Sequence, residues 1–197
     1  MYNTQVNLGP FAGDWGASSV EDHNYFVTFS GYAFDVTDPS TWTYDHRAQR
    51  TDIAQALSNT CRFNGHTQYY SVAEHSVWVS LLLQDQGYSP EVQRLGLWHD
   101  ATEAYVGDIP RPYKHLVSIA GVPFEEIEDR MAMQLFAHFS ILYSKSLWEA
   151  VKAADMEVYY LEREQRPRVS SNSTRGELPN LAGFGWLQRD CELSKWE

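Results

Sequence analysis

Three side chains that bind metal ions or move protons lie close together in one short stretch of the sequence. His99 and Asp100 are adjacent, and Glu103 follows about one helical turn later. On a helix, at about 100° per residue, the three fall within an arc of roughly 100°. The same face carries residues that belong in a core, namely Val92, Leu95 and Gly96. A histidine and two carboxylates on such a buried face are costly without partners, and a divalent cation suits both residue types.

Two further inward polar residues are predicted on other helices. His75 lies on an apolar helical stripe with Val72, Val79 and Leu82. Asp155 lies on a second stripe, formed by Val151, Ala154, Val158 and Leu161. Taken alone, an inward histidine is most often a hydrogen-bonded core residue, and an inward aspartate most often caps a helix or pairs with an arginine.

Taken together, these residues favour a metal site. Two histidines and two aspartates would come from three separate helices at matching inward phase, as His75, His99, Asp100 and Asp155. This nitrogen and oxygen set suits Mn, Co, Zn, Ni or Fe, with Mg also compatible, better than calcium. The set contains no thiolate, which argues against a structural zinc site. An open coordination position for water would make the site catalytic.

Helix caps predict where the elements that carry these residues begin and end. Ser71 and Glu74 form a capping box before the helix of His75, which gives Glu74 a structural role. The segment Ser89-Pro90-Glu91 starts the central helix, and Gly107 ends it. One continuous helix is therefore expected to carry His99, Asp100 and Glu103.

The remaining pattern predicts a single, mainly helical domain. Helices are expected at about residues 51–61, 72–85, 90–107, 124–139 and 147–164, the first with Ile53, Ala54 and Leu57 inward. Aromatic and β-branched residues between Asn24 and Val36 predict a small β-hairpin. The fold class is all-α, a helical bundle with a small N-terminal β-hairpin. Residues 1–24 are expected to form an irregular arm, residues 25–165 the domain, and residues 166–197 a loop-rich tail.

Composition and charge narrow the classes of function. The chain has 197 residues, 43% of them hydrophobic, enough for one domain with a sizeable core. Its net charge of −11 argues against an extended nucleic-acid interface, but a metal and a few arginines can still hold a small phosphate ligand. Cys61 and Cys191 form no disulfide framework. No apolar run approaches about 18 residues and no signal-peptide pattern is present, so we expect a cytoplasmic protein with no membrane partner.

The order of the ligands and the segments around them carry a resemblance to a known family. The order is a histidine, a histidine–aspartate pair and an aspartate. The flanking segments are Arg62-Phe63-Asn64-Gly65-His66-Thr67, Tyr70-Ser71-Val72-Ala73-Glu74-His75-Ser76 and the run from Leu97 to Pro110. Over roughly residues 30–165 the chain resembles the HD-domain metal-dependent phosphohydrolases. It is most similar to the branch of 5'-deoxynucleotidases and dNTP triphosphohydrolases found in bacteria and phages.

This resemblance implies a helical core that holds one or two divalent ions and hydrolyses a phosphate ester or anhydride, usually in a nucleotide. It implies that Glu103 and Asp108 are catalytic, and that Arg62 and Phe63 hold phosphate and sugar. The similar deoxynucleotidases have tryptophan where this chain has Phe63, so the choice between ribose and deoxyribose stays open. Similar proteins are often homo-oligomers, and a phage-encoded member would act in the host cytoplasm.

Elementary chemistry gives the same residues roles and alternatives. Glu103, one turn beyond the second histidine, is placed to manage a proton on the nucleophile or the leaving oxygen. Asp108 would orient water or protonate the leaving group, or it would form an Asx turn before the following Ile-Pro. Arg62 offers a planar fork for phosphate. Arg111 and Lys114 would help to bind substrate, or they are solvent-exposed charges on an acidic protein.

Three functions fit these observations. The first, which we prefer, is a 5'-nucleotidase that releases phosphate from (deoxy)nucleoside monophosphates. The second is a dATPase-like dNTP triphosphohydrolase that releases tripolyphosphate, favoured by the basic residues Arg111, Lys114 and His115. The third is a non-catalytic, metal-binding regulatory module, which loss of Glu103 or of a ligand would have favoured. Both are retained.

Overall fold

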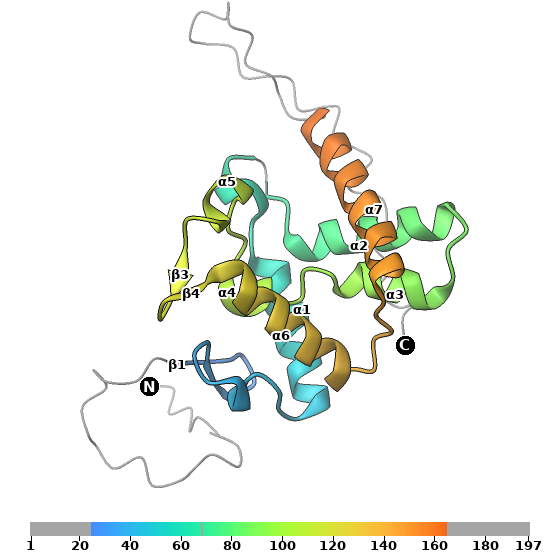
Figure 1. Cartoon of the computed structure of the whole chain (residues 1–197). Coiled ribbons are helices and arrows are strands. Elements are labelled where there is room, and N and C mark those ends of the chain that lie inside the picture. The colour runs from blue at the N-terminus through green and yellow to red at the C-terminus, as the bar shows by residue number, and fades with distance from the viewer. Residues whose placement is uncertain (1–24, 68, 165–197) are drawn as a thin grey trace, which may run out of the picture. The chain divides into compact units, whose positions relative to one another are not determined.

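The structure, a computed structural model, describes residues 25–67 and 69–164, and this part is mostly helical (Figure 1). The strands are β1 (Tyr25–Val27), β2 (Ala33–Asp35), β3 (Ser118–Ile119) and β4 (Val122–Pro123). The α-helices are α1 (His46–Asn59), α2 (Val72–Asp85), α3 (Pro90–Trp98), α4 (Glu103–Val106), α5 (Arg111–Lys114), α6 (Phe124–His138) and α7 (Lys145–Glu164). Two 3-10 turns are η3 (Pro39–Thr41) and η4 (Arg62–Gly65). The mainly helical class and the small N-terminal hairpin are confirmed, whereas the predicted arm (1–24) and tail (166–197) lie outside the described residues.

The chain divides into two compact units after Val158. The first unit contains β1 to α6 and the part of α7 that ends at Val158. The described part of the second unit is the end of α7, where the Arg163 guanidinium lies 5.6 Å from the centre of the Tyr159 ring. The domain boundary expected near residue 165 stays a prediction.

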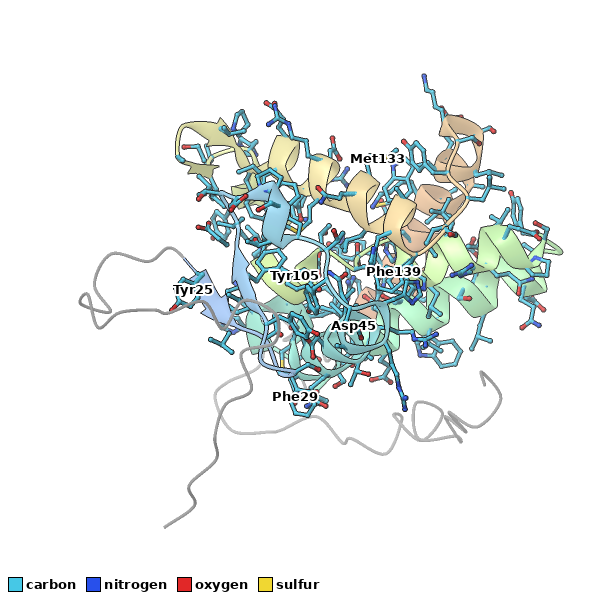
Figure 2. All side chains as sticks on the ribbon, turned by 90° about the horizontal axis from the view of Figure 1, so that it is seen from below. Tyr25, Phe29, Asp45, Tyr105, Met133 and Phe139 are labelled. Atoms are coloured by element: carbon cyan, nitrogen blue, oxygen red, sulfur yellow. The ribbon has the colours of Figure 1, made fainter. Side chains whose placement is uncertain are left out.

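The N-terminal hairpin supplies one large side chain to the core. β1 and β2 pair antiparallel, with Phe26 opposite Phe34. Phe34 is fully buried and its ring stacks on that of Tyr105 at 4.0 Å. Tyr25 and Phe29, labelled in Figure 2, are exposed. The hairpin therefore packs through Phe34 against the helix that carries Glu103.

Helix α1 begins earlier than the sequence pattern predicted. Asp45 caps it, because its side chain accepts hydrogen bonds from the backbone N–H groups of Arg47 and Ala48. The expected start at Thr51 was wrong. The first turn of α1 is polar, so the spacing of apolar residues gives no sign of it. The predicted inward residues Ile53 and Leu57 are buried, but Ala54 is exposed.

The central helix is not continuous, which corrects a second prediction. α3 ends at Trp98, and α4 begins only at Glu103. Between them the backbone makes tighter bonds, from Ala101 N–H to the Trp98 carbonyl and from Glu103 N–H to the Asp100 carbonyl. This turn still follows a right-handed helical path, so the side chains of the His99–Glu103 stretch keep their inward direction.

α2 and α3 pack closely, and Gly96 permits the approach. A Cβ atom on Gly96 would lie 2.5 Å from Leu83 Cδ1. Leu83, Leu95, Met131, Leu135 and Val151 are all fully buried in the surrounding core. This packing brings the turn that follows α3 next to α2.

The C-terminal half adds a feature that the sequence pattern missed. β3 and β4 form a second hairpin around Ala120 and Gly121, both with positive φ. α6 matches its predicted range to within a residue, and α7 begins two residues before its predicted start. In α7, Val151, Ala154 and Val158 are buried as expected, whereas Leu161 is exposed. No helix in the described ranges is long and apolar enough to cross a membrane.

Candidate metal centre

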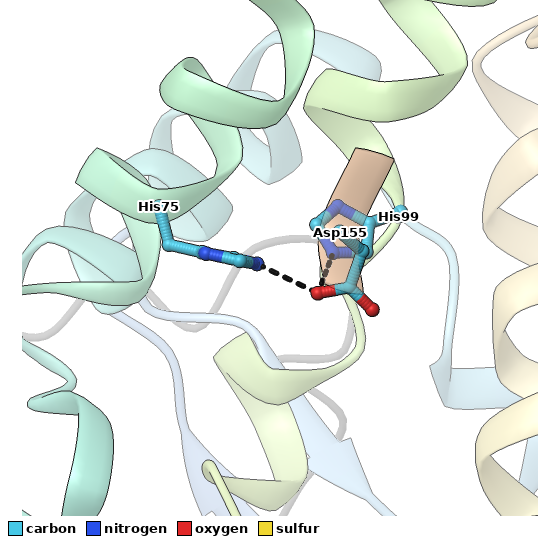
Figure 3. Close-up of side chains that lie close together, drawn as sticks. All are labelled: His75, His99 and Asp155. Carbon is cyan, nitrogen blue, oxygen red and sulfur yellow. Dashed lines mark hydrogen bonds and ion pairs between the residues drawn. The ribbon is translucent and has the colours of Figure 1, made fainter. Parts of the chain in front are cut away.

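Two imidazoles and one carboxylate meet inside the first unit. His75 of α2, His99 of the turn after α3 and Asp155 of α7 offer ligand atoms that all lie within 4.8 Å of one another. Asp155 Oδ1 is 3.1 Å from His75 Nε2 and 3.8 Å from His99 Nε2. Figure 3 shows both rings directed at this oxygen. Three of the four predicted ligands therefore form a candidate metal-binding triad.

Asp100, the fourth predicted ligand, lies beside this triad. Its Oδ2 atom is 3.1 Å from His99 Nε2 and 3.7 Å from His75 Nε2. Burial opposes ionisation of Asp100 and Asp155, but the neighbouring histidines outweigh it and hold the pKa of both carboxyls well below the usual range. Both aspartates are therefore carboxylates, the form that binds a cation.

The backbone carbonyl of Gly96 orients the ring of His99. His99 Nδ1 donates to the Gly96 carbonyl at 2.7 Å, which directs Nε2 at the two aspartates. Nε2 is buried and has no hydrogen bond of good geometry. A buried nitrogen that faces carboxylates needs a proton or a cation between them, so the residues fit a divalent ion.

The elements around the ligands explain why the histidine of α2 points inward. Ser71 caps α2, because its hydroxyl accepts a hydrogen bond from Glu74 N–H at 3.1 Å. This half of the predicted capping box fixes the phase of the helix. His75 then falls in line with Val72 and Val79, and all three are fully buried.

Both predicted catalytic carboxylates lie close enough to Asp100 to interact with it electrostatically. Glu103 is buried; its Oε1 atom is 3.7 Å from Lys114 Nζ, and its Oε2 atom has no hydrogen-bond partner among the described residues. Burial, with the nearby Asp100 and Asp108, raises the pKa of Glu103 well above its usual value. Burial also raises the pKa of Asp108, whose carboxylate accepts a hydrogen bond from Phe63 N–H.

Arg62, the predicted phosphate-binding residue, lies next to Asp100, one of the candidate metal ligands. Arg62 is buried, and its Nη1 atom is 3.8 Å from Asp100 Oδ2. Its guanidinium lies 5.4 Å from the centre of the Phe63 ring. Phe63 and Asn64 have φ of 61° and 53°, a left-handed conformation that asparagine tolerates but that is strained for Phe63. The bond from Phe63 to Asp108 holds this strained turn beside the site.

The two basic residues of α5 have different surroundings. Arg111 is exposed and donates to Met156 Sδ at 3.6 Å, next in sequence to Asp155. Lys114 is largely enclosed and bonds to Glu128 Oε1 at 2.9 Å, so the alternative of a solvent-exposed charge was wrong for it. His66, which directly follows η4, is exposed.

Two residues near the site were missed by sequence reasoning. Glu128 of α6 binds Lys114, and Lys152 of α7 lies 3.3 Å from Asp155 Oδ2. Lys152 stands three residues before Asp155, a spacing visible in the sequence. The pairing between α5 and α6 has no such local signal.

A comparison with known proteins found a partial match. No family model matches the chain. The uncharacterized protein YfdR of Escherichia coli strain K12 is 52% identical over 67 residues, which cover 34% of this chain and 35% of that protein. The chain thus matches this curated relative over about a third of its length, and the relative's name describes no activity.

Proposed function

We propose that this chain is an HD-type, metal-dependent phosphohydrolase that releases phosphate from (deoxy)nucleoside 5'-monophosphates. The observation that carries the proposal is the convergence of the triad His75, His99 and Asp155, with Asp100 beside it and the buried carboxyl of Glu103 in electrostatic contact with Asp100. Asp100, 3.1 Å from His99 Nε2, is the fourth ligand. The order of these residues along the chain is the one that the family resemblance implies.

The ligand atoms support a transition metal. Two imidazole nitrogens and two carboxylate oxygens suit Mn, Co, Zn, Ni or Fe, and Mg is compatible with the carboxylates. When bound, such an ion polarises a phosphoryl oxygen and acidifies water near neutral pH.

The residues of the chain perform the remaining steps. In hydrolysis a water oxygen bonds to phosphorus, the bond from phosphorus to the ester oxygen breaks, and a proton reaches that leaving oxygen. Glu103 Oε2, buried and without a hydrogen bond, is the atom that takes and returns this proton. Burial raises the pKa of Glu103 well above its ordinary value, so this carboxyl holds a proton more readily than an exposed glutamate does.

Charged residues at the edge of the site fit an anionic substrate. The guanidinium of Arg62 lies beside Asp100. Arg111 donates a hydrogen bond to Met156, which is next in sequence to Asp155. Asp108 acts by holding Phe63, and with it the turn of Arg62, through its hydrogen bond to the Phe63 N–H. These contacts support phosphate binding by Arg62, a group with a planar fork.

A panel of nucleotides tests the proposal. The protein is incubated with Mn²⁺ or Co²⁺ and separate NMPs, dNMPs and dNTPs, and the products are identified by phosphorus NMR. Inorganic phosphate from monophosphates is the expected result. We expect Glu103→Gln to bind metal normally and to lower kcat about 10²- to 10⁴-fold, since it removes the proton carrier. Glu125→Gln, an exposed acid of α6, is the matched control.

The other outcomes separate the alternatives. Tripolyphosphate from a dNTP would replace the nucleotidase by a triphosphohydrolase. Metal binding without turnover of any nucleotide would leave a regulatory module. A Glu103→Gln protein with full kcat would remove Glu103 from the mechanism.

A further inference from the structure

We propose that Lys114 and Glu128 position Glu103, so that Glu103 Oε1 is fixed and Oε2 is left to exchange the proton. This inference rests on the proposed function. It assigns Lys114 a role different from substrate binding, and it gives a role to Glu128 on a helix that carries none of the metal ligands.

The lysine ammonium lies between two carboxylates. Lys114 Nζ is 2.9 Å from Glu128 Oε1 and 3.1 Å from Glu128 Oε2, and it is 3.7 Å from Glu103 Oε1. The side chains are 22%, 15% and 6% exposed for Lys114, Glu128 and Glu103. Ion pairs that are this enclosed hold their geometry better than surface pairs do.

The two oxygens of Glu103 consequently have different environments. Oε1 faces the Lys114 ammonium, whereas Oε2 is buried with no hydrogen-bond partner in the described structure. The shorter and two-pronged contact of Lys114 is with Glu128, so Glu128 sets where the ammonium lies. The chain of contacts runs from α6 through α5 to α4.

This arrangement makes Lys114 a poor ligand for phosphate. Its ammonium already bonds to Glu128 and faces Glu103 Oε1, and it lies 5.9 Å from the centre of the buried Phe124 ring. A phosphate would have to displace one of these carboxylates. Arg111, which is exposed, has no such competitor among the contacts described.

Steady-state kinetics on the full chain distinguishes positioning from substrate binding. We expect Lys114→Met and Glu128→Gln each to lower kcat about 10- to 100-fold, the usual effect of losing a supporting partner, with KM changed less than about twofold. Mn²⁺ binding, followed by electron paramagnetic resonance, should be unchanged. Arg130→Met, which breaks the exposed Arg130–Glu126 pair on the same helix, is the control and should keep full kcat.

A charge exchange separates positioning from simple stabilisation. The double variant Lys114→Glu with Glu128→Lys restores an attractive pair, so its melting temperature should recover toward that of the unsubstituted protein. It places a carboxylate against Glu103, so kcat should stay low. Recovery of kcat in the double variant, or a rise in KM with unchanged kcat in the single variants, would overturn this inference alone. Absence of turnover by the unsubstituted protein would overturn the proposed function, and this inference with it.

Discussion

At the scale of residues, one nitrogen of His99 is the point where a proton and a metal ion compete. Nδ1 is committed to the Gly96 carbonyl, and Nε2 faces Asp100 and Asp155. Burial disfavours a charged imidazole, but the negative charge of Asp100 outweighs burial and raises the pKa of His99 from 6.5 to about 9. Without a cation, a proton therefore holds these groups together near neutral pH.

We expect metal binding to release this proton. His99 is protonated below about pH 9 when no metal is bound, and a ligand nitrogen must be unprotonated. Metal affinity should therefore rise from pH 6.5 and level off above about pH 9. Calorimetry at pH 7.5 in two buffers of different ionisation enthalpy should give about one proton released per ion. Affinity that does not vary across this range would contradict the role given to His99.

The same pKa shift fixes how the stability of chelator-treated protein depends on pH. A raised pKa means that the proton binds the folded state more tightly than the unfolded state. The contribution of His99 is therefore complete below pH 6.5 and is lost as the pH rises through about 9. Asp100 and Asp155 have lowered pKa values, so their contribution is present at neutral pH and is lost in acid.

At the scale of elements, caps and apolar stripes predicted the site better than they predicted helix ends. Ser71 and the stripe of α2 placed His75 correctly, and the stripe of α7 placed Asp155 at the correct phase. The sequence pattern missed the break after Trp98. There the backbone hydrogen bonds change from a four-residue to a three-residue spacing, which leaves the spacing of apolar residues almost unchanged. Glu128 was missed because its partner lies on another element, and sequence spacing carries no information on such pairs.

A substitution at Gly96 tests whether the close packing of α2 and α3 positions the candidate ligands. Its missing side chain lets α3 approach α2, and a Cβ there would lie 2.5 Å from Leu83 Cδ1. We expect Gly96→Val to lower the free energy of unfolding by about 1–3 kcal/mol through overpacking. Metal affinity should also fall, because His75 and His99 come from the two sides of this contact.

A double-mutant cycle with Leu83→Ala identifies the cause. Removing the Leu83 methyl groups makes room for the new side chain, so the two losses in unfolding free energy, measured with urea, should not add. The double variant should be less destabilised than the sum of the single variants. Strict additivity would show that the close contact between Gly96 and Leu83 does not limit the approach of these helices.

At the scale of the whole molecule, the net charge repels an anion, whereas single cations beside the candidate site attract it. The chain carries a net charge of −11, which repels anions at a distance. Near the triad, however, Arg62 lies 3.8 Å from Asp100, and Lys152 lies 3.3 Å from Asp155. The composition alone argued against a long nucleic-acid interface, but only the fold shows that these two cations lie beside the candidate metal ligands, as the proposed binding of a small phosphate requires.

A metal ion at this site would join parts of the chain that are far apart in sequence, so metal should stabilise the whole first unit. His75 and Asp155 are eighty residues apart and lie on α2 and α7. At a free metal concentration one hundred times Kd, binding adds about 2.7 kcal/mol to the free energy of unfolding. For a chain of this size, that corresponds to a rise of roughly 5–10 °C in the melting temperature. The rise should disappear with excess chelator and return when Mn²⁺ is restored. Asp155→Ala, which removes the ligand from α7, should show little of it, and an equal rise in this variant would place the metal outside the triad.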